Sequence, residues 1–435
     1  MGQNFGLGTA VAVGVGGIVG GGIYAAIGIV VGVAGYLTWL AYAIAGVVVL
    51  STAYSYVNLN RLTDDEGGSV TFIEELTGQS TYAAIVGWTL IVGYIGTMAM
   101  YAYAFGAFAE FLIGRSYIFG ISARPLLSTL IVVVFIALNL LGAGSSTSTE
   151  RYLVVIQAGI IFVFGLIALG FGFTQNELRV GLSSVTIDPL VAGAVSFVSF
   201  EGWQLLFYDQ EQFENPVETL AKGVFASIAV AAAIYILVGF VVPSLVPPAA
   251  FAAQPEAALN FAGLRISKWL ALGITIAALV STASAINSTM FSNAIFAKNL
   301  VSDGILPDRF SDTDHSDVPK RPVVIIGLLV IFVTVRGGLE SIVEFASLTY
   351  IVVYGSVNVV ALVKRDSDQI SPIPPVIGLV GSATFFVLLL RYLYLVKRPV
   401  FTAVVIIALV VFGIETIYFE RDMIKEGIEE AEEQA

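Results

Sequence analysis

Ionisable side chains are scarce inside the long apolar stretches of this sequence, and Glu201 is the one best placed to do chemistry. It stands in the run Ser-Phe-Glu-Gly-Trp-Gln at residues 199–204. A carboxylate surrounded by apolar chain must be paired, protonated or hydrated. Glu201 therefore either carries a proton or caps a broken helix. The adjacent Gly202 favours such a break, because glycine is a poor helix former.

A run of glycines near the start of the chain is the second candidate site. Gly20, Gly21 and Gly22 are consecutive within an apolar segment. Such a run leaves the backbone open to a ligand, because no side chain covers it. A small-residue face for close helix packing is the alternative, and it accounts for Gly14, Gly17 and Gly21 at helical spacing. It does not account for three glycines in a row, so we predict an unwound segment.

The elements that position these residues must lie in a membrane. The chain has 435 residues, of which 57% are apolar and 12% are charged, against roughly 25% charged in soluble domains. A single water-soluble core stops growing at about 250–300 residues and needs a polar surface, which this composition does not supply. The sequence therefore predicts a polytopic membrane protein.

The composition also excludes several kinds of site. No cysteine is present, which rules out disulfides and thiolate metal ligands. The single histidine, His315, lies in a charged loop, so histidine metal clusters and Ser-His-Asp catalysis within the membrane are excluded. The net charge of −12 is opposite to that of nucleic-acid-binding proteins. Acid-rich, lysine-poor loops favour origin in a halophilic archaeon, with ordinary solvated loops as the alternative.

Hydrophobic segments indicate about twelve membrane spans, since a spanning helix needs about 20 apolar residues. Divided at charged, Pro-rich or Gly-rich breaks, they are 8–34, 36–58, 82–113, 125–143, 151–173, 188–210, 222–246, 267–300, 321–336, 340–363, 373–391 and 399–419. The glycine run and Glu201 then fall in the first and sixth spans. Two breaks five spans apart are typical of a five-plus-five inverted repeat, with the substrate site between the breaks.

Three stretches resemble motifs of the amino acid-polyamine-organocation (APC) superfamily of amino acid permeases. Residues 18–24, Ile-Val-Gly-Gly-Gly-Ile-Tyr, are similar to the first-helix motif I-I-G-S-G-I-F, with Gly21 in place of Ser. Residues 200–203 and 211–216 resemble F-E-G-F-E followed by E-E-V-K-N-P. Residues 303–310 match D-G-x-x-P-x-x-F, which closes the eighth helix. The order and placement of these stretches extend the resemblance over nearly the whole chain.

The resemblance implies an all-α polytopic, leucine-transporter-like fold with broken helices 1 and 6. Residues 1–173 and 188–364 would form the two inverted five-helix repeats, 373–419 two peripheral helices, and 420–435 an acidic cytoplasmic tail. It also implies a secondary transporter of amino acids that works by alternating access in the cell membrane, with both termini cytoplasmic. The expected partners are a small-molecule substrate and the lipid bilayer, for a monomer or homodimer without cofactor, metal or nucleic acid.

The same resemblance implies where a substrate binds. Backbone N–H groups at the first break would receive a carboxylate, aided by the N-terminus of a half-helix. Carbonyls near Val19 and Phe200 would accept from an ammonium group. Trp203 is the expected wall of the side-chain pocket, with simple packing as the alternative, and Tyr350 is a weaker gate candidate. The predicted substrate-binding residues are Val19, Gly20, Gly21, Gly22, Ile23, Thr97, Phe200, Gly202 and Trp203.

Coupling is where the sequence departs from the resemblance. Many members of the superfamily carry a lysine in helix 5, but alignment places Gln157 there, and glutamine does not titrate. Hydroxyls of helix 8 could bind sodium or serve only as helix-packing residues. Glu201 is the remaining titratable group near the cavity, because Gln204 replaces the second carboxylate of its motif. The predicted coupling or gating residues are Gln157, Glu201, Ser281, Thr282, Ser284 and Tyr94, with a proton or sodium as the coupling ion, or exchange.

Other function classes fit the sequence less well. A membrane-embedded enzyme needs a nucleophile–base pair or metal ligands inside the spans. Only Glu110, Glu201 and Glu415 are expected to ionise there, so we predict that the protein is not an enzyme. A channel or a nutrient sensor could use the same scaffold. Among transporters, the alternatives are an amine, polyamine or other small organic-cation permease, or a sodium-coupled amino acid symporter.

Overall fold

The computed structural model describes residues 5–63, 67–141, 147–182, 186–208, 210, 213–247, 250, 254–302, 319–367 and 370–419. Nearly all of these residues are helical. In chain order the elements are α1 (Leu7–Val19), α2 (Gly22–Ala34), η1 (Gly35–Leu37), α3 (Thr38–Leu59), α4 (Ser69–Thr77), α5 (Ser80–Ile113), β1 (Tyr117–Ile118), β2 (Ile121–Ser122), α6 (Ala123–Leu140), α7 (Thr147–Thr174), α8 (Asp188–Val195), η3 (Phe197–Phe200), η4 (Trp203–Phe207), α9 (Pro216–Leu245), η6 (Pro255–Ala257), α11 (Ala258–Ile266), α12 (Lys268–Ser302), α13 (Lys320–Arg336), α14 (Leu339–Val363), α15 (Ile373–Val396) and α16 (Arg398–Phe419).

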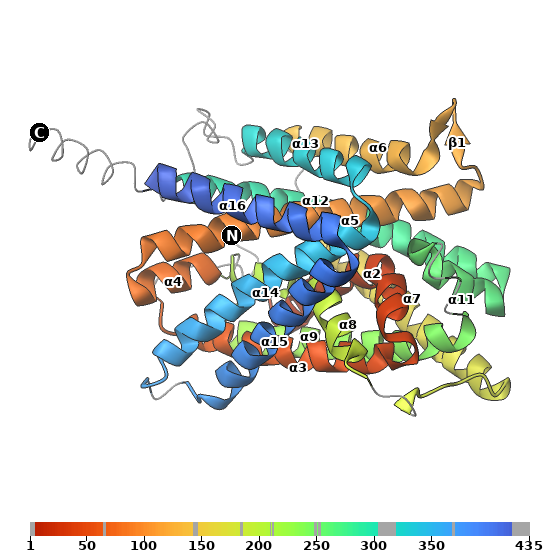
Figure 1. Cartoon of the computed structure of the whole chain (residues 1–435), viewed down its shortest axis with the longest axis horizontal. Helices are drawn as coiled ribbons and strands as arrows, with labels where there is room; N and C mark the ends of the chain where they lie inside the picture. Colours follow the sequence, from red (N-terminus) through yellow and green to blue (C-terminus); the bar gives the residue numbers. More distant parts are fainter. Residues whose placement is uncertain are drawn as a thin grey trace, which may run out of the picture.

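Figure 1 shows long helices packed side by side, with α4 at one end of the molecule and β1 and α11 at the other. We call these ends the α4 end and the α11 end. The two short strands pair antiparallel at the α11 end, Tyr117 opposite Ser122. Phe119 and Gly120 between them have φ angles of 51° and 78°, and positive φ at both central residues is what a tight type I′ hairpin turn requires.

Eight helices in the described part of the chain are long and apolar enough to cross a membrane, or nine if α8 is joined to η3 and η4 across their 53° bend. In this count α2 and α3 form one segment, and α1 and part of α16 are shorter apolar helices. The all-α polytopic fold class predicted from composition is confirmed. The number of twelve spans stays a prediction.

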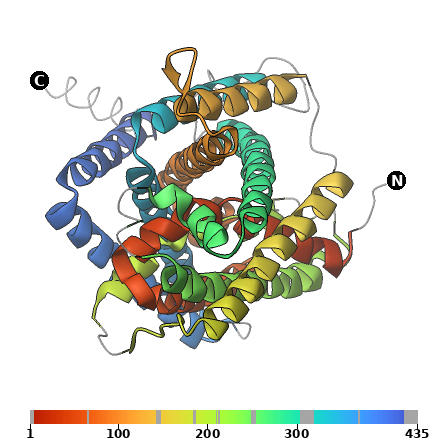
Figure 2. The same cartoon turned by 90° about the vertical axis from the view of Figure 1, so that its right-hand side faces the viewer.

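Long helices that pack on one another form the centre of the molecule. α5 packs against both α12 and α14, and α3 packs against α9. Figure 2, seen from the α11 end, shows α5 beside α12 and the α6–α13 pair on the outer face. The broken helices α1–α2 and α8–η4 lie among these central helices, and most of their side chains are buried. The bundle therefore holds both breaks in its interior.

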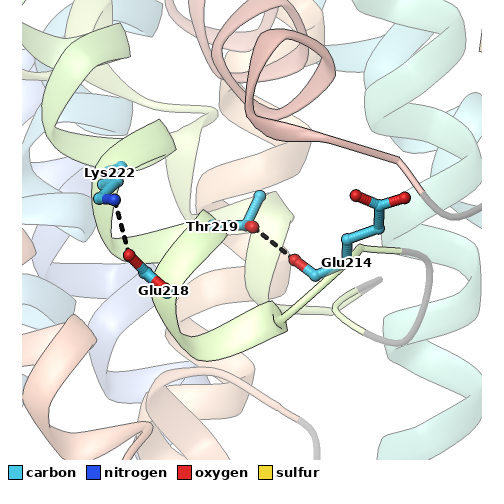
Figure 3. A network of polar contacts seen from close by, with 4 residues as sticks. All are labelled: Glu214, Glu218, Thr219 and Lys222. Carbon is cyan, nitrogen blue, oxygen red and sulfur yellow. Dashed lines mark hydrogen bonds and ion pairs between the residues drawn. The ribbon is translucent and has the colours of Figure 1, made fainter.

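The motif that precedes α9 serves as a helix start. Pro216 occupies the first turn of α9, where its missing N–H costs no hydrogen bond. The Thr219 hydroxyl donates to the Glu214 carbonyl, and Lys222 pairs with Glu218 at 2.6 Å (Figure 3). The two side chains of this pair are 61% and 68% exposed, so water screens the pair and it contributes little to stability. The role of these described residues is to position the start of α9, and their ion pair is exposed to solvent.

Some predicted features fall outside the described residues. They are Glu211 and Gln212 of the second motif, the third motif at 303–310, His315 and the acidic tail at 420–435.

Candidate functional site

The first break lies at Gly20 and Gly21. Gly20 keeps helical dihedral angles (φ −49°, ψ −44°), whereas Gly21 leaves them (φ −141°, ψ −22°) and a new helix begins at Gly22. The N–H groups of the first turn of α2 therefore have no acceptor within their own helix. Val19 and Ile23, on either side, are buried. The structure has the interruption that the glycine run predicts, and it is two residues long.

The sixth-span break lies at Glu201 and Gly202. Glu201 is extended (φ −72°, ψ 153°) and Gly202 has a φ of 116°, a conformation that residues with a side chain rarely adopt. The side-chain amide of Gln204 stabilises this turn through both its oxygen and its nitrogen. Its Oε1 accepts from the Gly202 N–H at 2.9 Å, and its Nε2 donates to Glu201 Oε1 at 3.2 Å. Gly202 was predicted to break the helix, and Gln204 replaces the second carboxylate of the motif. The two residues belong to one hydrogen-bonded turn.

The two breaks touch each other through backbone atoms. A Cβ added at Gly17 would lie 2.8 Å from the Gly202 carbonyl oxygen, and one added at Gly22 would lie 2.7 Å from Ser199 Cα. Both distances are shorter than real Cβ contacts, so these glycines allow the close approach. Gly17 therefore serves close helix packing, which was the alternative given for the small residues at helical spacing. Gly20 and Gly21 form the break. The first and sixth spans therefore meet at their two breaks.

Tyr235 of α9 also connects the two breaks. Its hydroxyl oxygen lies 2.7 Å from the Ile18 carbonyl and 2.7 Å from the Ser199 carbonyl. Ile18 and Ser199 come directly before Val19 and Phe200 in the chain. The carbonyls of Val19 and Phe200 are the ones predicted to bind an ammonium group. Tyr235 was not predicted, although it is the one tyrosine in the apolar α9 sequence and a buried tyrosine hydroxyl usually finds a hydrogen-bond partner.

Glu201 is buried, with 1% of its surface exposed, and neutral groups hold it. The Tyr101 hydroxyl donates to Glu201 Oε2 at 3.3 Å, opposite the bond from Gln204. Within the described residues Glu201 forms no ion pair with lysine or arginine. A buried carboxylate without a basic partner can take up a proton or the cationic group of a ligand. Tyr101 was not predicted, because only the fold brings it to Glu201.

Predicted contacts on α5 lie against α14. Thr97 Oγ1 is 3.0 Å from the Tyr350 hydroxyl oxygen, and the Tyr94 and Tyr350 rings are 6.1 Å apart. Tyr354, one turn further along α14, donates to Gln204 Oε1 at 2.9 Å. This α5–α14 surface therefore reaches the sixth-span break through Gln204. Tyr354 was missed, since its spacing from Tyr350 is equally typical of a core position.

Trp203 packs within an aromatic cluster on the side of the break that leads to the α4 end. It is fully buried, and its ring centroid lies 4.9 Å from that of Tyr56 and 5.4 Å from that of Tyr354. Phe72 and Phe207 complete the cluster around Tyr56. The Trp203 Nε1 has no hydrogen-bond partner among the described residues. The packing role is thus present in this structure, and the role as a substrate wall stays a prediction. Phe200, also fully buried, faces the opposite way, toward Tyr42 and Tyr235.

The predicted hydroxyls of helix 8 lie on α12. This helix approaches the first break at Ala285, whose Cβ lies 3.3 Å from a Cβ added at Gly20. Ser281 is fully buried and its hydroxyl has no partner in the described part of the chain, whereas Thr282 donates to a carbonyl of its own helix at 2.7 Å. Ser284 is half-buried. The sodium alternative stays a prediction.

Gln157 lies on α7 and is 4% exposed, and its Nε2 has no partner within the described residues. The described residues hold no group of three or more His, Cys, Asp or Glu side chains that could bind a metal.

Glu344 of α14 is a second buried carboxylate, so the expectation that only Glu110, Glu201 and Glu415 ionise within the spans was wrong. It is fully buried, and its Oε1 lies 3.6 Å from Lys397 Nζ, which also binds Glu340. These residues lie where α14 begins and α15 ends. Among the residues that the structure describes, Glu344 has a basic partner and Glu201 has none. The sequence signal was present, because Glu344 falls inside the predicted span 340–363.

Comparison with known proteins identifies the family. The amino acid permease family profile matches residues 5–415. This chain belongs to the amino acid permease family. The permease is 22% identical to the inner membrane transport protein YbaT of Escherichia coli over 396 residues, 89% of each chain. It is 25% identical to protein MJ0609 of Methanocaldococcus jannaschii over 94% of each chain. It is 27% identical to the vacuolar cationic amino acid transporter 2 of Arabidopsis thaliana over 73% of this chain and 53% of that one.

Solved structures agree on the fold. The manganese transporter of Eremococcus coleocola superimposes with a TM-score of 0.62 over 96% of this chain and 94% of that one, at 12% identity. At this identity the likeness concerns the fold alone. The predicted superfamily and the leucine-transporter-like fold class are confirmed. The family and its named relatives are transporters, so the permease is a multi-pass membrane protein of amino acid transport and the enzyme alternative is rejected.

Proposed function

We propose that this permease is a secondary transporter that moves amino acids across the cell membrane by alternating access. The observation that carries the proposal is the meeting of the two helix breaks beside a buried carboxylate. Gly17 contacts Gly202 through the backbone, and Glu201 lies in the same turn as Gly202. Interrupted helices are tolerated inside a membrane only where protein or a lined cavity satisfies the backbone, and transporters place their substrates at such interruptions.

An amino acid zwitterion has two charged groups that need opposite partners once water is removed. The substrate carboxylate would bind the N–H groups at the start of α2, around Gly22 and Ile23, where the helix dipole favours negative charge. The ammonium group would face the sixth-span break. The Phe200 carbonyl and the Glu201 carboxylate are the acceptors proposed there. The Tyr235 hydroxyl has one hydrogen and donates it to the Ile18 or the Ser199 carbonyl, both of which lie 2.7 Å away.

The proposed mechanism uses two inverted repeats, residues 1–173 and 188–364, and several features of the packing support this division. Each begins with a broken helix. The long helices α5 and α12 have 34 and 35 residues and pack on each other. The short helices α4 and α11 have nine residues each and lie at opposite ends of the molecule (Figure 1). Residues 373–419 are then peripheral, and both termini are cytoplasmic, in a monomer or homodimer.

For coupling we propose that Glu201 carries a proton, or that transport is an exchange of substrates. Gln157 does not titrate, and Glu344 is paired with Lys397. Sodium coupling at Ser281, Thr282 or Ser284 is the alternative.

A cationic substrate is the second candidate. Glu201 has no basic partner among the described residues, and Tyr101 lies against it. A carboxylate combined with aromatic rings is a suitable environment for an ammonium or guanidinium group. One relative is named a cationic amino acid transporter. The substrate would then be a cationic amino acid, an amine or a polyamine.

Radiolabelled uptake into proteoliposomes tests these proposals. The panel should contain L-leucine, L-alanine, L-glutamate, L-lysine, L-arginine and 1,5-diaminopentane, each with no gradient, a pH gradient or a sodium gradient. Uptake of at least one amino acid above that of protein-free liposomes is expected. Uptake of the diamine alone would favour the organic-cation permease. No uptake and no exchange of any amino acid would contradict amino acid transport.

A further inference from the structure

Tyr101 of α5 lies directly over the first break. A Cβ added at Gly21 would lie 2.1, 2.4 and 2.8 Å from Cδ1, Cε1 and Cγ of the Tyr101 ring. These distances are far below van der Waals contact, so the ring rests on the Gly21 backbone itself. The space above the broken backbone, where a ligand would approach, is filled by this ring.

The hydroxyl of the same side chain reaches the other break. It donates to Glu201 Oε2 at 3.3 Å, and Tyr101 as a whole is 1% exposed. One side chain therefore covers the backbone of the first break and hydrogen-bonds the carboxylate of the sixth-span break. A movement of the ring away from Gly21 also changes the hydrogen bonding of Glu201.

We propose that Tyr101 is a gate that the substrate carboxylate displaces when it binds at Gly21, and that this displacement frees one oxygen of Glu201. The proposal rests on the proposed function of the two breaks. Once Tyr101 has moved, Glu201 keeps its bond from Gln204, and Oε2 becomes available to the substrate ammonium group or to a proton. Occupation of the first break is thereby communicated to the second through one residue.

The gate has a definite energetic consequence. The binding-competent state requires the Tyr101–Glu201 bond to break, and the measured affinity is the intrinsic affinity multiplied by the fraction of molecules in which that bond is broken. Removal of the hydroxyl alone should therefore strengthen apparent substrate binding. If Tyr101 instead contacted the substrate through its hydroxyl, the same change would weaken binding.

The first test measures steric coupling without any substrate. Thermal unfolding in detergent is compared for wild type, Gly21→Ala, Tyr101→Ala and the double variant, with Gly32→Ala as control because an added Cβ there meets no atom within 4 Å. Gly21→Ala should lower Tm by several degrees in the presence of Tyr101 and have little further effect in the Tyr101→Ala background. An equal decrease in both backgrounds would mean that the ring does not restrict Gly21, which overturns the gate.

The second test measures uptake by Tyr101→Phe of whichever amino acid the wild type takes up best. KM should fall about fivefold, equivalent to about 1 kcal/mol, the usual net worth of one hydrogen bond. Tyr24→Phe is the matched control, because this buried hydroxyl has no hydrogen-bond partner in the described part of the chain, and its KM should not change. An unchanged or raised KM in Tyr101→Phe contradicts the gate.

The two tests separate the gate from the proposed function. A wild-type protein that transports no amino acid contradicts amino acid transport. The unfolding measurements still decide whether the Tyr101 ring restricts Gly21.

Discussion

The two helix breaks lie against each other, but they present different chemical groups. The first break consists of glycines and offers only backbone groups. The sixth-span break carries Glu201 and Gln204 and satisfies its own turn with side-chain hydrogen bonds. One break can thus bind a charged ligand group through N–H donors, while the other presents an ionisable side chain. This contrast fits the proposed function, in which the first break recognises the substrate and the neighbouring sixth-span break couples transport to a proton.

The glycines of the two breaks also serve different purposes. Gly21 has a negative φ of −141°, so a side chain is excluded there by space, because the Tyr101 ring occupies the position of a Cβ. Gly202 has a φ of 116°, so a side chain is excluded by backbone conformation as well as by contact with Gly17. Each purpose can be tested separately.

Gly21→Val should have the largest effect, a loss of uptake of at least about 100-fold in a protein that still folds and inserts. A β-branched side chain has no room beneath Tyr101 and stiffens the backbone, and overpacking of a buried site costs about 1–3 kcal/mol. Uptake per milligram of reconstituted protein is the measurement. Gly32→Val in the same helix is the control, since its Cβ meets nothing within 4 Å. Wild-type uptake by Gly21→Val would remove the first break from the site.

Gly202→Ala should destabilise the fold more than it alters substrate preference. The left-handed conformation costs about 1–3 kcal/mol for a residue with a side chain, and the added Cβ would lie 2.4 Å from the carbonyl carbon of Gly17. Thermal unfolding in detergent should show a Tm several degrees below that of Gly273→Ala, whose Cβ has open space. Equal Tm values for the two variants would argue against a conformational need for glycine at 202.

Glu201→Gln should abolish accumulation driven by a pH gradient and retain counterflow exchange of preloaded substrate. Glutamine keeps the shape and the hydrogen bonds of a permanently protonated carboxyl group but cannot release a proton. Accumulation and counterflow are measured in the same vesicles, with the exposed Glu218→Gln as control. Undiminished proton-driven accumulation would exclude Glu201 as the carrier. A requirement for sodium would transfer coupling to the α12 hydroxyls Ser281, Thr282 or Ser284.

Trp203→Ala should have the most selective effect, weakening uptake of large aliphatic or aromatic substrates by roughly 10–200-fold, or about 1–3 kcal/mol, and leaving uptake of small substrates nearly unchanged. Competition by a panel of unlabelled amino acids measures the ranking of substrates. Trp269→Ala is the control, because that side chain is 71% exposed. An unchanged ranking would leave Trp203 as part of the aromatic cluster around Tyr56 and nothing more.

The features that could be predicted depend on residues close together in the chain. A glycine run interrupts a helix wherever it lies, and a glutamate followed by glycine in an apolar span must bend away from ideal helix geometry. Both breaks were therefore placed correctly, as was the membrane-embedded all-α class. The carboxylate Glu344 was overlooked although its sequence position was informative. Its partner Lys397 lies more than 50 residues away, so their pairing could not be predicted.

The sequence by itself determined that the helices lie in a membrane, that two of them are broken, and that Glu201 lies at one break, because composition, backbone propensity and hydrophobic segments are local properties of the chain. Only the tertiary structure decided which side chains meet at the breaks. Tyr101, Tyr235 and Tyr354 come from three different helices, and the helical pattern that places a tyrosine in the core is the same whether its hydroxyl meets Glu201, a backbone carbonyl or no partner at all. The packing of α5, α9 and α14 against the broken helices makes that choice, since it alone fixes the distance between groups far apart in sequence.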